Sequence, residues 1–308
     1  MHLKKNTKFF PIILFAYNRP IHTKKVLNQL KKNKFANRSE LYVFCDGPKN
    51  KKDVYKILKI KKFIQNLNGF KKVQCFFHPK NVGLKKSILF GINKIFKNYE
   101  AAIILEDDIY TSNNFLIFMN QSLHQFKNHH KVWHINGWCL PLKNESKNKT
   151  FFYRTMHCWG WGTWANKWKY YSDNIKSIEK KMNKKKIFYF NNDGTENFYW
   201  QLLANKKKYT TTWSIFWYLT IFINKGLCLS PSISLTRNIG LDGSGVHSKK
   251  TNNPSTNLKL NNSLYFMYPK KVVEDKLMFK KISGYYKSSN SIRKRLFNKV
   301  YYFFKVFW

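Results

Sequence analysis

The residues most suggestive of chemistry lie in the middle of the N-terminal half. The short apolar run AAIIL at 101–105, which predicts a buried strand, is followed directly by Glu106, Asp107 and Asp108. Carboxylates in this position are hard oxygen ligands that suit Mg²⁺ or Mn²⁺ and leave coordination sites for phosphate oxygens. An ordinary acidic loop at the start of the next helix is the alternative interpretation. The chain has only 15 Asp and Glu, so three adjacent acids favour the metal site.

The surrounding pattern predicts the elements that would position these acids. Apolar runs predict strands at 11–17, 40–45, 72–77, 101–105 and 131–137. Between them, helical stretches are expected to about residue 33, after residue 48, over 84–97 and over 113–127. Nearly continuous apolar strands separated by helices are typical of a mostly parallel α/β sheet covered on both faces.

Polar residues follow four of the predicted strands. They are Asn18 and Arg19, then Asp46, then Asn81, and finally the acidic triplet. Ligands of such sheets bind beyond the carboxyl ends of the strands. The sequence therefore predicts that these residues form one site.

The composition is strongly basic. There are 57 Lys and Arg, and the formal net charge is +42. This charge would attract polyanions, although the Lys- and Asn-rich composition of an AT-rich genome explains it as well. A hydrophobic fraction of 43% allows a substantial core. Five cysteines without a CxxC pair, no run of ~18 apolar residues and no signal-peptide pattern lead us to expect a cytoplasmic protein.

Several blocks of sequence resemble a known family. They occur in the family's order between residues 11 and 247, and they are FAYNRP (15–20), CDGPK (45–49), NVGLKKSILFGINKIF (81–96), LEDDIYTSNNFLIFMN (105–120), WGWGTWANKW (159–168) and NIGLDGSGVH (238–247). They look like bacterial GT-A-fold glycosyltransferases, similar to the N-acetylglucosaminyltransferase that initiates N-glycan branching. The resemblance implies a Rossmann-like, mostly parallel sheet with helices on both faces and a smaller aromatic-rich acceptor lobe. It also implies transfer from a nucleotide diphosphate sugar, UDP-linked, with Mn²⁺ or Mg²⁺.

The resemblance assigns roles by position. Asp108 would bind the metal as part of a DxD-type motif, with Glu106 and Asp107 facing the donor sugar and ribose. Further donor contacts would come from Asp46 at the base, Arg19 at the diphosphate, and Asn81, Gly83 and Lys86 around the pocket. For Asp46 and Gly83, simple turn chemistry is the alternative.

An inverting transfer needs a general base for the acceptor hydroxyl. Related enzymes carry an acid after the Trp-rich block, which aligns with Glu196, and Asp193 is the alternative. Either residue could instead cap the helix that follows. His247 could complete the metal shell or lie exposed in a Gly-rich turn. Of Trp159, Trp161, Trp164 and Trp168, we expect most in the core and one at the acceptor.

We expect a glycosyltransferase domain over 1–248, with a nucleotide-sugar half at 1–140 and an acceptor half at 141–248. A polar loop and a basic aromatic tail would fill 249–308. The tail at 290–308 could hold the enzyme on an anionic inner membrane, near a lipid-linked or lipopolysaccharide glycan. The alternative is a basic membrane-surface or nucleic-acid-binding protein without catalysis. No nucleic-acid recognition motif supports specific binding of DNA or RNA.

Overall fold

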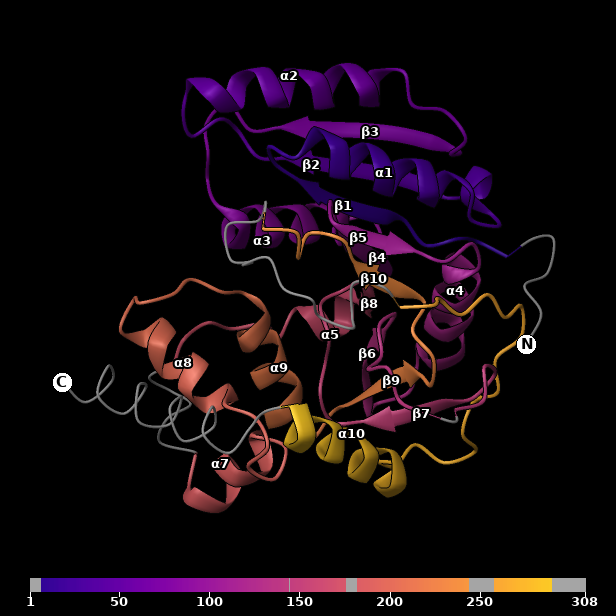
Figure 1. The fold of residues 1–308 in the computed structure, drawn as a ribbon, viewed down its shortest axis with the longest axis vertical. Coiled ribbons are helices and arrows are strands. Elements are labelled where there is room, and N and C mark those ends of the chain that lie inside the picture. The colour runs from indigo at the N-terminus through magenta and orange to yellow at the C-terminus, as the bar shows by residue number, and fades with distance from the viewer. Residues whose placement is uncertain (1–6, 144, 176–181, 244–257, 290–308) are drawn as a thin grey trace.

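The computed structural model describes residues 7–143, 145–175, 182–243 and 258–289, and it has an α/β fold built on one large sheet (Figure 1). The strands are β1 (Ile12–Ala16), β2 (Glu40–Cys45), β3 (Lys72–Phe77), β4 (Ala101–Glu106), β5 (Ile109–Thr111), β6 (Val132–Asn136), β7 (Thr150–Tyr153), β8 (Trp161–Trp164), β9 (Leu227–Pro231) and β10 (Thr236–Asn238). The helices are α1 (Pro20–Lys31), η1 (Ala36–Arg38), α2 (Lys51–Gln65), α3 (Leu84–Ile95), α4 (Phe115–Phe126), α5 (Ala165–Trp168), α7 (Lys184–Phe190), α8 (Phe198–Lys206), α9 (Ser214–Ile223) and α10 (Lys276–Ser289).

The large sheet has the strand order β3-β2-β1-β4-β8-β6-β9-β7. The four strands β3, β2, β1 and β4 are parallel, as are β6 and β9. Strand β8 runs antiparallel to both of its neighbours, β4 and β6, and β7 runs antiparallel to β9. The mostly parallel sheet predicted from the sequence is confirmed. A small second sheet pairs β5 with β10.

Helices cover both faces of this sheet because the strands are apolar on both sides. In β1, Ile12 and Leu14 face the core formed with α1, α2 and α4, while Ile13 and Phe15 face the core formed with α3 and α9. Every residue of β1 is buried. This arrangement explains why the strand reads as a continuous apolar run and not as an alternating one.

The aromatic-rich second half forms a smaller lobe of α7, α8 and α9, at the lower left of Figure 1. Phe190 stacks on Tyr218 with ring centroids 4.5 Å apart, and Phe198 contacts the same tyrosine ring at 5.0 Å. Of the four tryptophans in the WGWGTWANKW block, Trp161, Trp164 and Trp168 are buried in the core, as expected. Trp159 is only partly buried.

Among the described residues, no helix is both long enough and apolar enough to cross a membrane. Two features predicted from the sequence, His247 and the basic aromatic tail at 290–308, lie outside the described residues.

Candidate active site at the carboxyl ends of the strands

The ends of β1 and β4 lie side by side, and this brings Arg19 to the acidic triplet. The parallel register aligns Phe15 with Glu106, so the residues that follow each strand leave the sheet together. The Arg19 guanidinium donates a short hydrogen bond to Asp107 and a second one, of 3.0 Å, to Oδ2 of Asp108. The backbone N–H of Tyr17 donates to the other oxygen of Asp107 at 3.3 Å. The predicted convergence of these two strand ends is therefore seen as direct contacts.

The cluster carries an excess of negative charge. Three carboxylates, when ionised, face one guanidinium, so two negative charges remain uncompensated. Burial raises the pKa of Glu106, and the neighbouring Asp108 and Asp107 carboxylates raise it further. Burial also raises the pKa of Asp107, to about 6, although Arg19 opposes this change. Because mutual repulsion and burial disfavour the ionised forms, a cation entering the cluster would be stabilised.

Residues 238–242 close over this cluster. Pairing of β10 with β5 sets Asn238 opposite Ile109, and the N–H of Ile239 donates to the carbonyl of Asp108 at 2.8 Å. Gly240 then passes so close that a Cβ on it would lie 2.4 Å from Oδ2 of Asp108 and 2.6 Å from Nη1 of Arg19. Only glycine fits at this position without displacing the charged groups.

Asp46 joins the end of β2 to the loop before α3. One carboxylate oxygen accepts the N–H groups of Gly47 and Val82, and the other accepts the N–H of Gly83, all at 2.9 Å. Asn81 donates to the carbonyl of Gly47 at 3.2 Å. These bonds give Asp46 a structural task, while its second oxygen keeps a lone pair for a ligand.

The start of α3 is open to approach. Gly83 has a φ of +83°, and a Cβ there would meet no atom within 4 Å. Lys86, in the first turn of the helix, is exposed. The assignments of Asn81, Gly83 and Lys86 to a donor pocket stay predictions.

Asp53, in the first turn of α2, is a buried acid that sequence reasoning missed. Its carboxylate accepts from the Tyr17 hydroxyl at 2.6 Å and from the Asn18 amide at 2.7 Å. Burial opposes ionisation of Asp53, but these hydrogen bonds outweigh burial and lower its pKa. An acid in the first turn of a Lys-rich helix, directly after the Asp46 turn, was a usable signal for it.

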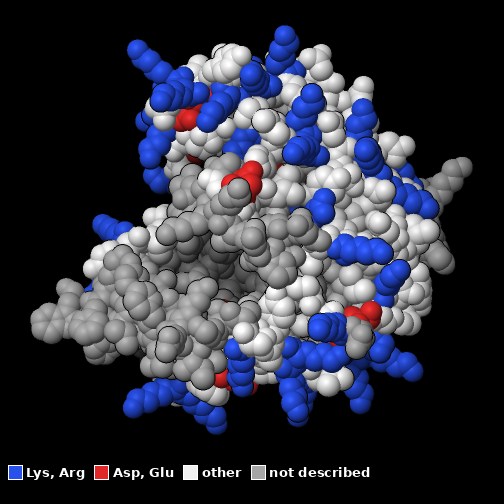
Figure 2. All heavy atoms as spheres, in the orientation of Figure 1, with Lys and Arg blue, Asp and Glu red and all other residues white. Residues whose placement is uncertain are grey.

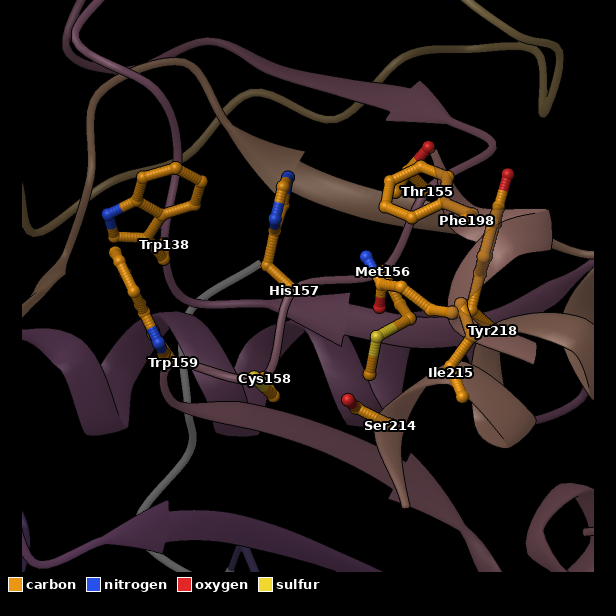
Figure 3. Close-up of a pocket in the computed structure, with 11 residues that line it drawn as sticks. Trp138, Thr155, Met156, His157, Cys158, Trp159, Phe198, Ser214, Ile215 and Tyr218 are labelled. Carbon is orange, nitrogen blue, oxygen red and sulfur yellow. The ribbon is translucent and has the colours of Figure 1, made fainter. Parts of the chain in front are cut away.

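A pocket opens beside the acidic cluster, and Figure 3 shows 11 of its residues. Its volume is about 230 Å³. Trp138 and Trp159 lie on one side and Phe198 and Tyr218 on the opposite side, with His157 between them. Burial raises the pKa of the lining residue Cys158, and the carboxylates of Glu106 and Asp108 raise it further. Gly160, next to the lining residue Trp159, packs against Leu105 and Ile109, the residues on either side of the acidic triplet. The pocket therefore borders the acidic cluster.

The two candidate bases differ in their surroundings. One carboxylate oxygen of Glu196, Oε1, is buried and accepts no hydrogen bond from the described residues. Burial raises the pKa of Glu196 to about 7. Asp193, in contrast, accepts from Arg154 at 2.9 Å. The carboxylate of Asp193 is therefore committed to an ion pair, while Glu196 forms none with the described residues.

The loop that carries both acids is held in a strained conformation. Asn192, Asp193 and Gly194 have φ values of +50°, +54° and +77° in succession. A non-glycine residue in this region costs about 1 kcal/mol or more, so the surrounding structure must impose it.

Tyr153, the last residue of β7, and the two residues that follow it hold this loop in its conformation. The Tyr153 hydroxyl accepts from the Asn192 amide at 3.0 Å, and the Thr155 hydroxyl donates to the same side chain at 2.8 Å. Between them, Arg154 donates to Asp193 and, through two nitrogens, to Glu274 at 2.7 and 2.6 Å. Sequence reasoning missed Arg154 and Glu274 because they are 120 positions apart.

The carboxylates of the acidic cluster fit a divalent cation that a bound ligand, such as a diphosphate, would also coordinate. Within the described ranges, no three His, Cys, Asp or Glu side chains form a ready metal site. Mg²⁺, however, is commonly held by one or two carboxylates plus substrate phosphates and water. In the contacts with Arg19, Asp108 uses only Oδ2, and full ionisation of the three carboxylates would leave two negative charges for a divalent ion.

Comparisons with known proteins give structural likeness only. No family model and no curated protein matches the chain. Among solved structures, S. aureus TarS aligns with a TM-score of 0.43 at 12% identity, over 74% of this chain and 36% of that one. TarS 1–349 in complex with UDP aligns with a TM-score of 0.42, also at 12% identity, over 74% and 59%. The mannosyltransferase PcManGT from Pyrobaculum calidifontis, in complex with GDP-Man and Mn²⁺, aligns with a TM-score of 0.34 at 9% identity, over 55% and 47%. The chain thus spans less than two thirds of each of these structures, and at these TM-scores the likeness establishes neither a family nor an activity.

Proposed function

We propose that this protein is a glycosyltransferase that moves a sugar from a nucleotide diphosphate to a glycan acceptor. One observation carries the proposal: the acidic cluster of Glu106, Asp107 and Asp108 borders a sugar-sized aromatic pocket. The cluster supplies a place for a cation and a diphosphate, and the pocket supplies a place for a sugar ring. This arrangement suits transfer of a sugar from a diphosphate bound at the cluster to a sugar bound in the pocket.

The donor side of the proposal rests on the strand ends. Arg19 offers positive charge at the mouth of the cluster, and Asp46 and the open start of α3 lie at the ends of the neighbouring strands. We assign the nucleotide to this edge, with a UDP-linked sugar, such as N-acetylglucosamine, as the donor. A bound Mn²⁺ or Mg²⁺, with Asp108 as its direct ligand, would neutralise the charge that collects on the diphosphate.

Glu196 is the proposed general base. Its pKa of about 7 places it close to the pH at which a base works best. The acceptor hydroxyl would give its proton to Glu196 as its oxygen bonds to the anomeric carbon, while the bond from that carbon to the diphosphate breaks. The electron pair of the broken bond stays on the diphosphate. A direct displacement of this kind inverts the anomeric centre.

The basic charge of the molecule says less about its binding partner than the acidic cluster and the pocket do. On the face shown in Figure 2, Lys and Arg are spread over the upper, right and lower parts and do not gather into one stripe. A stripe or patch is the usual footprint of a nucleic-acid-binding surface. We propose an acceptor in a surface polysaccharide or lipopolysaccharide, lipid-linked and presented at an anionic inner membrane that residues 290–308 would contact.

Calorimetric titration tests the proposal. UDP, GDP and several UDP-sugars would be titrated with and without Mn²⁺, into the wild type and Asp108→Ala. We expect metal-dependent binding of one nucleotide to the wild type, and the dependence on metal should be lost in Asp108→Ala. Glu100→Ala is the control, because Glu100 is exposed and directly precedes the same strand β4. If no nucleotide binds, while RNA or anionic vesicles bind with a steep salt dependence, the glycosyltransferase proposal is wrong.

A further inference from the structure

The described residues that line the pocket are all uncharged, in a protein whose formal net charge is +42. None of the 11 residues drawn in Figure 3 is Lys, Arg, Asp or Glu. Burial lowers the pKa of His157 to about 4, so its imidazole is neutral near pH 7. Burial likewise raises the pKa of Cys158 and of Tyr218, which keeps both side chains protonated.

Four described charged groups can be related to this lining, and they are acidic or already paired. Glu106 and Asp108 act on Cys158, and Glu196 lies two residues before the lining residue Phe198. Arg154, next to the lining residue Thr155, binds Glu274 and Asp193. Its guanidinium also stacks on the rings of Tyr189 and Phe279, at 3.5 and 4.2 Å. These four described groups would therefore offer an anion in the pocket carboxyl groups and a cation whose donors are engaged.

Uncharged groups suited to a sugar are present instead. Trp159 is half-buried and presents an aromatic surface on which the C–H face of a sugar ring can pack. Ser214 and Gln201 add a hydroxyl and an amide, which can donate to and accept from sugar hydroxyls. The volume, about 230 Å³, suits one monosaccharide unit.

We infer that this pocket takes an uncharged sugar unit of the acceptor and rejects one that carries a carboxylate, phosphate or sulfate. The inference rests on the proposed glycosyltransferase function and adds the acceptor's chemical class to it. Its basis is the cost of moving an unpaired charge out of water, which far exceeds the cost of moving a hydroxyl that finds a partner. The selectivity would oppose the long-range attraction that the basic surface exerts on anionic glycans.

A matched pair of acceptors tests this inference in the full-length protein. Methyl β-glucoside and methyl β-glucuronide differ only at C6, and the corresponding galactoside and galacturonide form a second pair. With the donor found by titration, we expect kcat/KM to favour the neutral member of one pair by about a hundredfold or more. Equal use of both members, preference for the uronide, or use of neither pair would overturn the inference. Donor binding in the same samples shows separately whether the glycosyltransferase proposal holds.

A charge introduced into the lining should reverse the selectivity. Ser214 begins α9 and is half-buried, so Ser214→Lys would place an ammonium group at the pocket. We expect the ratio of kcat/KM for glucuronide over glucoside to rise about tenfold or more. Thr211→Lys, an exposed position three residues earlier, adds the same charge outside the lining and should leave the ratio unchanged. An unchanged ratio in Ser214→Lys would mean that the acceptor sugar binds elsewhere.

Discussion

Gly240 and Asp108 are packed so closely that a methyl group on residue 240 would lie 2.4 Å from the Asp108 carboxylate. The same methyl group would also press on the Arg19 guanidinium. The loop that covers the acidic cluster therefore limits where both charged side chains can go. Donor binding should be sensitive to this one position, although glycine itself has no group that could bind a ligand.

We expect Gly240→Ala to weaken nucleotide binding by about tenfold or more, because the cost of overpacking, about 1–3 kcal/mol, falls on the charged cluster. Titration calorimetry with the nucleotide that binds the wild type is the measurement. Gly284→Ala is the matched control, since a Cβ at this position in α10 meets no atom within 4 Å. Equal affinity of Gly240→Ala and wild type would show that the 238–242 loop moves freely away from Asp108.

Glu196→Gln should abolish sugar transfer while leaving nucleotide binding intact, because the amide cannot accept the proton of the acceptor. In the wild type, kcat should rise with pH through a midpoint near 7, where Glu196 loses its proton. Full activity of Glu196→Gln would move the base to another residue, and the same assay on Asp193→Asn would then identify or exclude Asp193.

The raised pKa of Glu196 also predicts a pH-dependent stability. The folded state holds the proton to about pH 7, while an ordinary glutamate releases it near 4.5. The free energy of unfolding should therefore fall as pH rises from about 4.5 to about 7, by up to about 3 kcal/mol. Glu196→Gln should lack this component, so urea unfolding at pH 4.5 and pH 8 should show its stability relative to wild type increasing with pH. Parallel pH profiles for the two proteins would contradict the burial of a titrating carboxylate.

Arg154→Met should destabilise the protein by about 3–5 kcal/mol, because it leaves the carboxylates of Glu274 and Asp193 without their buried partner. Adding Glu274→Met should recover part of this loss, and urea unfolding of the four proteins in the cycle gives the coupling energy. The pair of exposed Lys71 and half-buried Glu40 provides the control, since Lys71→Met should cost less than 1 kcal/mol. If Arg154→Met costs no more than Lys71→Met, Arg154 does not hold the 192–194 loop.

Asp53→Asn should lower the free energy of unfolding by about 2 kcal/mol, because two partly buried hydrogen bonds from Tyr17 and Asn18, directly after β1, lose their charged acceptor. The lowered pKa of Asp53 means that its stabilisation is present above about pH 4 and is lost as pH falls further. Urea unfolding at pH 7 and pH 3 measures both effects. Lys52→Ala, on the same turn of α2 but exposed, should change stability little at either pH. A loss that does not shrink at pH 3 would contradict an ionised Asp53.

The strands of the N-terminal half could be predicted closely, because each is an apolar run that ends in a polar turn. The predicted 40–45 and 72–77 coincide with β2 and β3, and 101–105 falls one residue short of β4. Strand β8 was not predicted from WGTW, because two tryptophans around a Gly and a Thr give no useful periodicity. Its antiparallel direction between β4 and β6 depends on pairing with strands far away in the chain, which no local pattern encodes.

The sequence predicted where the site lies in the fold, but not which side chains pair within it. Polar residues after parallel strands had to meet at one edge, and Arg19 and the acidic triplet do so. The sequence could not tell that Arg19 would bind two of those acids, because side-chain pairing depends on distances of a few ångströms. Arg154, Asn192 and Glu274 come together from three separate segments, so their arrangement could not be anticipated.

The insertion of β8 beside β4 also bears on how the chain is made. Strand β4, fully apolar from Ala101 to Leu105, is the outermost strand of the parallel group until residues 161–164 pair with it. A ribosome must therefore release some sixty further residues before this edge is covered. An uncovered apolar edge invites pairing with other chains. A nascent or truncated chain ending near residue 140 should thus depend on chaperones, and aggregation would be the expected fate of such a fragment.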